Sequence, residues 1–350
     1  MEIIGELADN CIIIKKSSDV GRLYNKSHFG TPLKGNRLQL TLLEGVFLLD
    51  EGKMRLFQDT KPVDFQQIVE IAAQHIPDFE TKYLVFKDLR NRGHAVSLLP
   101  KENTVMFQRF QQKNEEAPAY AIVAFSERDF LDIEAIRQQI IESAKKGAAL
   151  WLALVDEEGD ITYYDVSALE LNGEIFAQKY QRNTGILLKN RLIVFDKKLS
   201  HQLHQKEFFG KPFGDALQLS FVEGLYLLKK GILEIQTSDG KTYSEGKTLL
   251  YMQKLQPDIR ERLVVFEDLK QRGLLVKTGF KFGAHFRAYT KLPDTAHAEF
   301  LIHVVKKGFT SIWAEISRAV RLAHSVNKEF VFARVNEKTV EYYKLGRLRP

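Results

Sequence analysis

Three residues near the end of the chain carry side chains that together can cleave an RNA phosphodiester without a metal ion. Tyr289 ends the sequence FRAY, His297 lies in KLPDTAHAE, and Lys328 stands between RAVRLAHSVN and EFVFA. Tyr289 suits a base that takes the proton of the attacking 2′-hydroxyl, if nearby cations favour the phenolate. His297 suits the acid that protonates the departing 5′-oxygen. Lys328, a compact ammonium, suits the charge that develops on phosphorus. The products would be a 2′,3′-cyclic phosphate and a 5′-hydroxyl.

The chain contains a long internal repeat, and the residues of this candidate triad are present in only one copy. Residues 1–170 align with 181–350 at an offset of 180 with one single-residue slip, as in YLVFKDLRNRG and LVVFEDLKQRG. At this offset the three triad positions hold Arg109, Ala117 and Ala148 in the first repeat. We therefore expect one active site per chain, kept in the second repeat and lost from the first.

Each repeat is expected to fold in two parts, which makes the chain α/β (α+β) with two tandem repeats. A small N-terminal α/β subdomain is followed by a mixed-sheet nuclease subdomain flanked by helices. The expected boundaries are 1–98 and 99–170 in the first repeat, and 171–278 and 279–350 in the second. The connection at 171–180 is not low in complexity, so we expect a closely packed junction.

Hydrophobic spacing and turn residues predict the elements within these parts. In the front parts we expect β-branched strands at 11–16 and 191–195, helices at 38–49, 65–76, 217–228 and 247–256, and helices that end near Gly93 and Gly273 before a strand. In the rear part of the second repeat we expect strands at 280–291 and 300–305, a helix at 311–326 capped by Thr310 or Ser311, and a hairpin of 329–335 with 339–345.

Charge differs sharply between the two rear parts. Residues 99–170 hold 7 Lys and Arg against 14 Asp and Glu, whereas residues 279–350 hold 13 against 6. Net charges of −7 and +7 on equivalent units indicate that the second faces a polyanion and that the first can dock on a basic surface. Drift of solvated faces after duplication is the alternative. The net charge of the whole chain, +6, points weakly the same way.

Several other chemistries lack their motifs. The sequence has no GxxxxGK[ST] or GxGxxG loop, no CxxC or HExxH, no GxSxG, and no convincing carboxylate cluster for two metals. We therefore expect no metal and no cofactor. Cys11 is the one cysteine, which suits a reducing cytoplasm, and neither a secretory signal nor an apolar run of about 20 residues is apparent. We expect a cytoplasmic protein without a membrane segment.

The segments that hold the triad resemble archaeal tRNA-splicing (tRNA-intron) endonucleases of the homodimeric two-repeat type. These segments are GFKFGAHFRAYTK, HAEFLIHVV, and W-x₄-RAVRLAHSVNKEFVFA followed by EYY, with RLAHSVNKE the most specific. The resemblance implies that Tyr289, His297 and Lys328 are catalytic and that the first repeat is inactive. It also implies cleavage of precursor tRNA at bulge-helix-bulge structures. The rival interpretations are a non-catalytic RNA-binding subunit of an RNA-processing complex and a metal-dependent nuclease.

The resemblance also implies residues for RNA binding and assembly. Arg321 would stack on a bulge base, Arg318 is a candidate for a phosphate contact, and Arg347 is the candidate for a second stacking arginine. An acidic loop of the inactive unit would enter a basic cleft of the opposing catalytic unit. In this chain the loop is DEEGD, whose acidic residues are Asp156, Glu157, Glu158 and Asp160; a solvated hairpin tip is the alternative. We expect a symmetric homodimer, one site per bulge, whose interface includes the terminal strand EYYKL.

Overall fold

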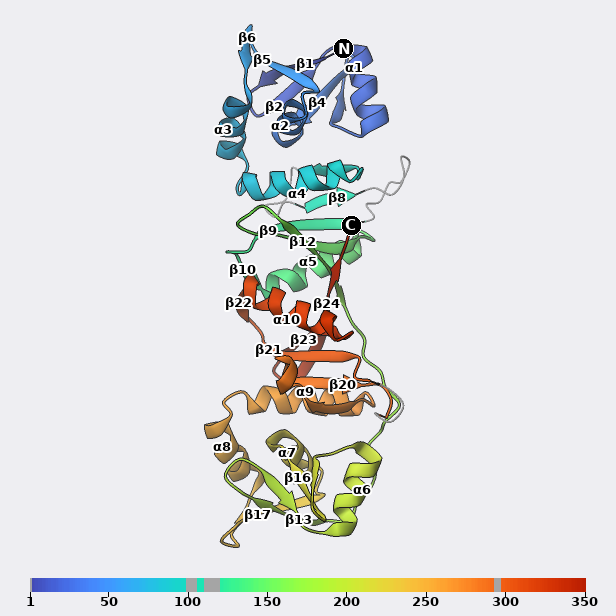
Figure 1. Ribbon diagram of the computed structural model, residues 1–350, viewed down its shortest axis with the longest axis vertical. Helices are drawn as coiled ribbons and strands as arrows, with labels where there is room; N and C mark the ends of the chain where they lie inside the picture. Colours follow the sequence, from blue (N-terminus) through green and yellow to red (C-terminus); the bar gives the residue numbers. More distant parts are fainter. Residues whose placement is uncertain (1, 99–105, 110–119, 293–296) are drawn as a thin grey trace.

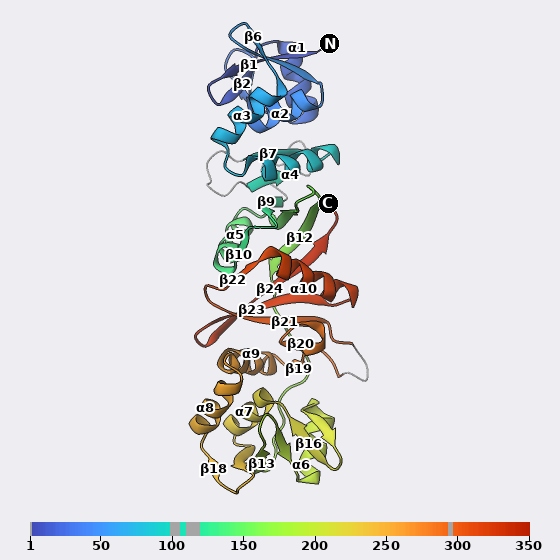
Figure 2. The same cartoon turned by 60° about the vertical axis from the view of Figure 1, so that its left-hand side comes forward.

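The structure, a computed structural model, describes residues 2–98, 106–109, 120–292 and 297–350. Figure 1 and Figure 2 show an elongated molecule with a small α/β unit at each end and a continuous sheet between them. The N-terminus lies at one end, and the C-terminus lies in the middle. Within the described residues, no helix combines the length and the hydropathy needed to cross a bilayer.

The two end units repeat one fold, in agreement with the sequence repeat. Their six-stranded sheets have the corresponding orders β3-β4-β2-β1-β5-β6 and β15-β16-β14-β13-β17-β18. The elements of the first unit are β1 (Ile3–Ala8), β2 (Cys11–Ile14), α1 (Ser17–Val20), β3 (Thr31–Leu33), β4 (Arg37–Thr41), α2 (Leu42–Asp50), β5 (Met54–Gln58), β6 (Lys61–Val63) and α3 (Phe65–His75). Those of the second are β13 (Asn183–Leu187), β14 (Leu192–Val194), α6 (Lys197–Glu207), β15 (Lys211–Phe213), β16 (Ala216–Leu219), α7 (Phe221–Lys229), β17 (Leu233–Thr237), β18 (Thr242–Tyr243) and α8 (Glu245–Leu255).

The helices expected at 38–49 and 217–228 begin later than the apolar spacing predicts. Thr41 and Ser220 each form a capping box, with Glu44 and Glu223 respectively, and this starts α2 at Leu42 and α7 at Phe221. The preceding LQL segments alternate between the two faces of β4 and β16. Each capping glutamate also accepts a backbone N–H from the turn before its strand, from Gly30 or Gly210. The capping box therefore joins helix, strand and turn in both repeats.

The two rear parts form one ten-stranded sheet across the repeat boundary. Its order is β19-β20-β21-β23-β24-β12-β11-β9-β8-β7, so the repeats meet where β24 pairs antiparallel with β12. The strands of the first repeat are β7 (Val96–Leu98), β8 (Met106–Arg109), β9 (Tyr120–Ser126), β11 (Ala149–Val155) and β12 (Ile161–Ala168). Those of the second are β19 (Leu275–Thr278), β20 (Phe286–Tyr289), β21 (Phe300–Lys306), β23 (Glu329–Asn336) and β24 (Thr339–Leu348).

Helices cover both faces of this sheet. Helices α5 (Ile133–Lys145) and α10 (Trp313–Ser325) share one buried cluster on one face, in which Ile136 of α5 and Trp313 of α10 take part. Helices α4 (Phe79–Asn91) and α9 (Ile259–Gln271) pack on the other face and extend it into the cores of the end units. Neighbouring residues of β11 point to opposite faces of the sheet. Trp151 packs in the cluster under α4, and Leu152 packs in the cluster under α5 and α10.

Two expectations for the second repeat need correction, and the pairing of the terminal strand limits a third. The expected strand 280–291 is a 3₁₀ turn (Phe280–Phe282) followed by the shorter β20. Neither Thr310 nor Ser311 caps α10, because both lie in β22 (Thr310–Ile312), which pairs with β10 (Phe130–Asp132); the N-cap is Ile312, without a side-chain hydrogen bond. The terminal strand β24 pairs with β23 on one edge and β12 on the other, so its backbone has no open edge for a second chain.

The expected domain boundaries at 98/99 and 278/279 cut across the ten-stranded sheet. Strands β7 and β19, which these boundaries leave in the front parts, pair with β8 and β20 of the rear parts. Helices α4 and α9 contact rear-part strands as well. We therefore propose that each rear part begins with its helix, at Phe79 and at Ile259.

The connection after the first repeat is closely packed, as its composition predicts. The N–H groups of Gly173 and Ile175 donate to the carbonyls of Arg272 and Gly273 at 2.9 and 2.7 Å. Leu171 and Ile175 are buried. Gly273 has φ +78°, the left-handed conformation of a helix C-terminus. The connection thus fixes the end of α9 and the start of β19 beside Tyr289.

The sheet of the second repeat also holds two partly buried histidines. His285 Nδ1 accepts the N–H of Val304 at 3.0 Å, and the ring of His303 lies among those of Phe309, Phe330 and Phe332. Burial lowers the pKa of His285 to about 3 and that of His303 to about 4, with smaller contributions from the charge of Arg262. Both rings are therefore neutral near pH 7 and serve packing.

Replacing Gly173 by alanine should destabilise the second repeat by about 1–3 kcal/mol, the usual cost of overpacking. A Cβ at this position would collide with the carbonyl of Gly273, which is backbone and cannot turn away. Gly246→Ala is the matched control, because a Cβ there meets nothing within 4 Å and lies in α8. Chemical denaturation should show the control unchanged or up to about 1 kcal/mol more stable. Equal stabilities of the two variants would contradict the packing described.

His303→Phe should reduce the loss of stability on acidification. In the unfolded chain histidine has a pKa near 6.5, whereas folded His303 has one of about 4. Its neutral form contributes stability that is complete above pH 6.5 and is lost progressively as the pH falls toward 4, because only the unfolded chain takes up the proton. Urea unfolding at several pH values should give a shallower decline in the variant. An unchanged decline would show that His303 is not held neutral.

Candidate functional site

Tyr289 is placed at the end of β20 by pairing with Leu275 of β19. Its side chain is 7% exposed and packs in a small cluster with Ile175, Leu275 and Ala298. It also lines a cavity of about 600 Å³ between the front and rear parts of the second repeat. The ring is thus held firmly, with one side toward that cavity.

Lys328 lies at the junction of α10 and β23. Asn327 adopts the left-handed conformation (φ 53°), and the N–H of Lys328 donates to Ala323 O at 2.9 Å, which ends the helix. Lys328 Nζ donates to Ala298 O at 2.7 Å. Desolvation lowers the pKa of Lys328, and the charges of Arg287 and Lys281 lower it further. An ammonium in such cationic surroundings gains from binding an anion.

His297 is exposed and directly precedes Ala298. The returning chain is fixed by backbone hydrogen bonds, from Glu299 N to Ala288 O at 3.1 Å and from Glu329 N to Glu299 O at 2.8 Å. Ala298 therefore connects the three candidates: it packs against Tyr289, accepts a hydrogen bond from Lys328 and follows His297. Residues 279 to 350 also contain His324, in the last turn of α10.

Strand register corrects one of the three equivalences between the repeats. Phe107 pairs with Ile122 in the first repeat, and Phe286 pairs with Ile302 in the second. Arg109 is therefore equivalent to Ala288, and Tyr289 is equivalent to residue 110, which lies outside the described residues, as does Ala117. Ala148 is the true counterpart of Lys328, since its N–H donates to Ser143 O at the same helix end.

Arg287 is a further candidate residue of this site, and the sequence motifs did not indicate it. It lies two residues before Tyr289 on the same face of β20, and its guanidinium carbon is 5.8 Å from the centre of the Tyr289 ring. Its Nε is buried and has no hydrogen-bond partner within the described structure. By register its counterpart in the first repeat is Gln108. The alternation in FRAY, with the repeat comparison, could have identified it.

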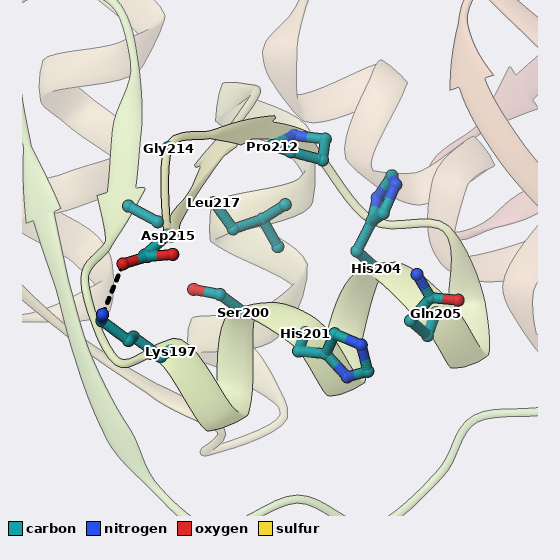
Figure 3. A pocket seen from close by; sticks show the side chains of 10 residues that line it. Lys197, Ser200, His201, His204, Gln205, Pro212, Gly214, Asp215 and Leu217 are labelled. Atoms are coloured by element: carbon teal, nitrogen blue, oxygen red, sulfur yellow. Dashed lines mark ion pairs between the residues drawn. The ribbon is translucent and has the colours of Figure 1, made fainter.

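The cavity beside Tyr289 is cationic in the second repeat alone. Its lining includes Arg191, Lys211, Lys277 and Arg287. Strand register places Cys11, Thr31, Ser97 and Gln108 at the equivalent positions of the first repeat, none of them basic. Figure 3 shows a smaller adjoining cavity of about 310 Å³, which has the Lys197–Asp215 ion pair on one side and His201 and His204 of α6 on the other.

The candidate RNA-binding arginines gather elsewhere, where the repeats meet. Arg318 and Arg321 of α10 line a cavity of about 410 Å³ that shares no lining residue with the cationic cavity. Arg321 Nη2 donates to Ser317 Oγ at 3.1 Å. Burial raises the pKa of Tyr164, and the charges of Arg321 and Arg347 oppose this, so both arginines lie close to that phenol. In one chain, the structure does not bring these arginines into the cavity of Tyr289.

The acidic loop joins β11 to β12 and forms another wall of the 410 Å³ cavity through Asp156 and Asp160. Asp156 Oδ1 accepts the N–H groups of Glu158 and Asp160 at 3.0 and 2.9 Å, so this carboxylate builds the turn. Glu157 pairs with Arg128, and Glu158 is exposed. The loop is therefore an ordered, exposed acidic tip.

Comparison with known proteins agrees with this architecture. The family model of the catalytic C-terminal domain of tRNA intron endonucleases matches residues 79–163 and 259–342. The model of the N-terminal domain of the same family matches residues 3–69 and 184–249. Both domains thus occur twice, and the catalytic matches begin at α4 and α9.

Three relatives that match nearly the whole chain are each named tRNA-splicing endonuclease. The tRNA-splicing endonuclease of Methanococcoides burtonii is 33% identical over 98% of this chain and 99% of its own length. That of Methanosarcina barkeri is 32% identical over 96% and 97%, and that of Halobacterium salinarum is 29% identical over 94% and 95%. With both of its domains matched twice, the chain belongs to the tRNA intron endonuclease family.

Proposed function

We propose that this protein excises introns from precursor tRNA by cutting bulge-helix-bulge RNA through attack of the 2′-hydroxyl on the scissile phosphate. The observation that carries the proposal is the arrangement around Ala298, which lies against Tyr289, binds Lys328 and follows His297. Membership of the family supports the substrate class. The ends formed would be a 2′,3′-cyclic phosphate and a 5′-hydroxyl, without a metal ion.

Each residue of the triad has a role that fits its place. Tyr289 is held by packing beside the guanidinium of Arg287, and its hydroxyl would take the proton of the attacking 2′-hydroxyl. His297, exposed at the returning loop, protonates the leaving 5′-oxygen. Lys328, in cationic surroundings, meets the negative charge of the phosphorane.

We further propose that the active form is a homodimer in which the acidic loop of each chain enters the cationic cavity of the other. One chain carries one triad, whereas excising an intron takes two cuts, and a two-fold dimer offers two sites. The charges support this pairing, because the acidic tip belongs to the first repeat and the basic lining to the second. Complementary charge of this kind favours a specific partner.

This docking would also bring the separated groups together. The acidic loop and the arginines Arg318 and Arg321 line one cavity, whereas Tyr289 and Arg287 line the cavity proposed to receive the loop. Loop insertion would therefore carry the arginines of one chain toward the triad of its partner. In this arrangement each bulge meets a triad from one chain and base-stacking arginines from the other.

His297→Ala should lower the single-turnover rate on a bulge-helix-bulge RNA by roughly 10²–10⁴-fold, the usual contribution of a general acid. RNA affinity should be retained, because the side chain is proposed to move a proton rather than to hold the strand. His201→Ala, a histidine of the adjoining cavity, is the control and should cleave normally. A 2′-deoxy sugar at the cut should also block cleavage. Wild-type rates in His297→Ala would show that His297 is not the acid and would contradict the proposed triad.

Reversing the acidic tip with Glu157→Lys and Glu158→Lys should convert the dimer to a monomer of 40.3 kDa in light scattering. The changed side chains would meet the basic lining of the partner cavity with like charge. Glu337→Lys in the equivalent hairpin turn of the second repeat is the control and should leave the mass unchanged. If both variants remain dimers, the loop does not hold the assembly.

A further inference from the structure

The contact between the repeats is nearly two-fold symmetric, but only one of its halves contains a network of paired charges across the contact. On one side of the β12–β24 pair, Glu134 and Arg137 of α5 bind the hairpin of the second repeat. Arg334 donates to Glu134 and to Glu341 at 2.6 Å each, and Arg137 Nε donates to Glu341 at 3.0 Å. These four side chains form one continuous network of alternating charge.

The equivalent half has four neutral residues in place of that network. The strand register and the sequence repeat identify the equivalent residues. The counterparts of Glu134, Arg137, Arg334 and Glu341 are Ala314, Ser317, Leu154 and Thr162, respectively. All four line the cavity of about 410 Å³. The cavity therefore lies where the other half holds four large charged side chains, and its volume lies in the range of ligand sites, about 300–1,000 Å³.

The residues that line this cavity can recognise a nucleobase. Arg321 supplies a planar guanidinium, on which a base can stack, and Arg318 supplies further donors. Asp160 and Glu127 supply acceptors for exocyclic amino groups. A site with both signs of charge and neutral small residues suits a polar, uncharged, planar ligand better than a bare phosphate.

Arg321 is held from the first repeat through a chain of two hydrogen bonds. The hydroxyl of Tyr164, in β12, donates to Ser317 Oγ at 2.7 Å, and the same oxygen accepts Arg321 Nη2 at 3.1 Å. Tyr164 and Ser317 are 1% and 3% exposed, so neither can turn away. Each member of the chain limits where the guanidinium can lie.

We propose that Tyr164 of the first repeat, acting through Ser317, positions Arg321 against the unpaired base that the function proposed above brings to this cavity. The proposal rests on the function proposed above and adds a role for the repeat that lacks the triad. Tyr164 is a positioning residue, since it is buried and contacts Ser317 rather than the base. The inactive repeat thus contributes to substrate binding as well as to the scaffold.

The test compares Tyr164→Phe with Tyr343→Phe. Strand register makes Tyr343 the counterpart of Tyr164, and it is equally buried but belongs to the half that contains the charge network. Affinity is measured by fluorescence anisotropy on a bulge-helix-bulge RNA made uncleavable by a 2′-deoxy sugar at each cut, so cleavage does not enter. Tyr164→Phe should weaken binding about two- to tenfold, the effect of one lost hydrogen bond, and Tyr343→Phe should bind as wild type.

A second RNA, with abasic sites in place of the bulge bases, separates positioning from general damage. On this RNA wild type and Tyr164→Phe should bind equally, because the base that Arg321 meets is missing. Ser317→Ala should reproduce the effect of Tyr164→Phe, and the double variant should be no weaker than either single one. If Tyr164→Phe fails to fold, Ser317→Ala alone still tests the proposal.

Equal losses in Tyr164→Phe and Tyr343→Phe would overturn the proposal, as would a loss that persists on abasic RNA. The role of Tyr164 and the proposed cleavage can be contradicted by different results. If the wild type cleaves the RNA but Tyr164→Phe binds the uncleavable form normally, the base site is wrong and the proposed function stands. If the wild type never cleaves but its binding depends on Tyr164 and on the bulge bases, the reverse holds.

Discussion

Backbone hydrogen bonds between β12 and β24 hold the two repeats in a single sheet, and the placement of the candidate groups of one repeat relative to those of the other follows from this pairing. The register of Tyr164 against Arg347 and of Tyr163 against Leu348 fixes the two-fold relation between the halves. It places α5 beside α10 over one buried cluster and sets the acidic loop against the arginines of α10. Because both edges of β24 are used, a second chain cannot add a strand to β24.

Within this symmetric frame, differences in chemistry follow the repeats. The second repeat holds the triad and the cationic cavity, and the first holds the acidic tip. Structural devices are shared, for example the capping boxes of Thr41 with Glu44 and Ser220 with Glu223. The two copies therefore share interactions that build each unit and differ at the candidate site, the acidic tip and the charge network of Arg334. This is the physical basis for reading function from differences between the copies.

The sequence alone predicted the repeat, the hairpin of 329–335 with 339–345, and the helices that end at Gly93 and Gly273, because each has a strong local signal. It missed the start of α2 and α7, where apolar spacing outweighed the capping boxes, and the strand β22 before α10, which forms only by pairing with β10. The strand alternation in FRAY was enough to identify Arg287, but the charge network of Arg334 could not be located from one-dimensional spacing. Its residues come from strands and helices distant in sequence, and the equivalence of residues across the repeats depends on a strand register that slips by one residue.

The proposed function depends on a phenol, an imidazole and an ammonium around Ala298 that would cleave RNA by using its own 2′-hydroxyl. The most direct measurement is analysis of the ends produced when the wild-type protein cuts a bulge-helix-bulge RNA in the presence of EDTA. Metal-independent attack of the 2′-hydroxyl should give full cleavage with 2′,3′-cyclic phosphate and 5′-hydroxyl ends. Cleavage that stops in EDTA, or that leaves a 3′-hydroxyl and a 5′-phosphate, would contradict it.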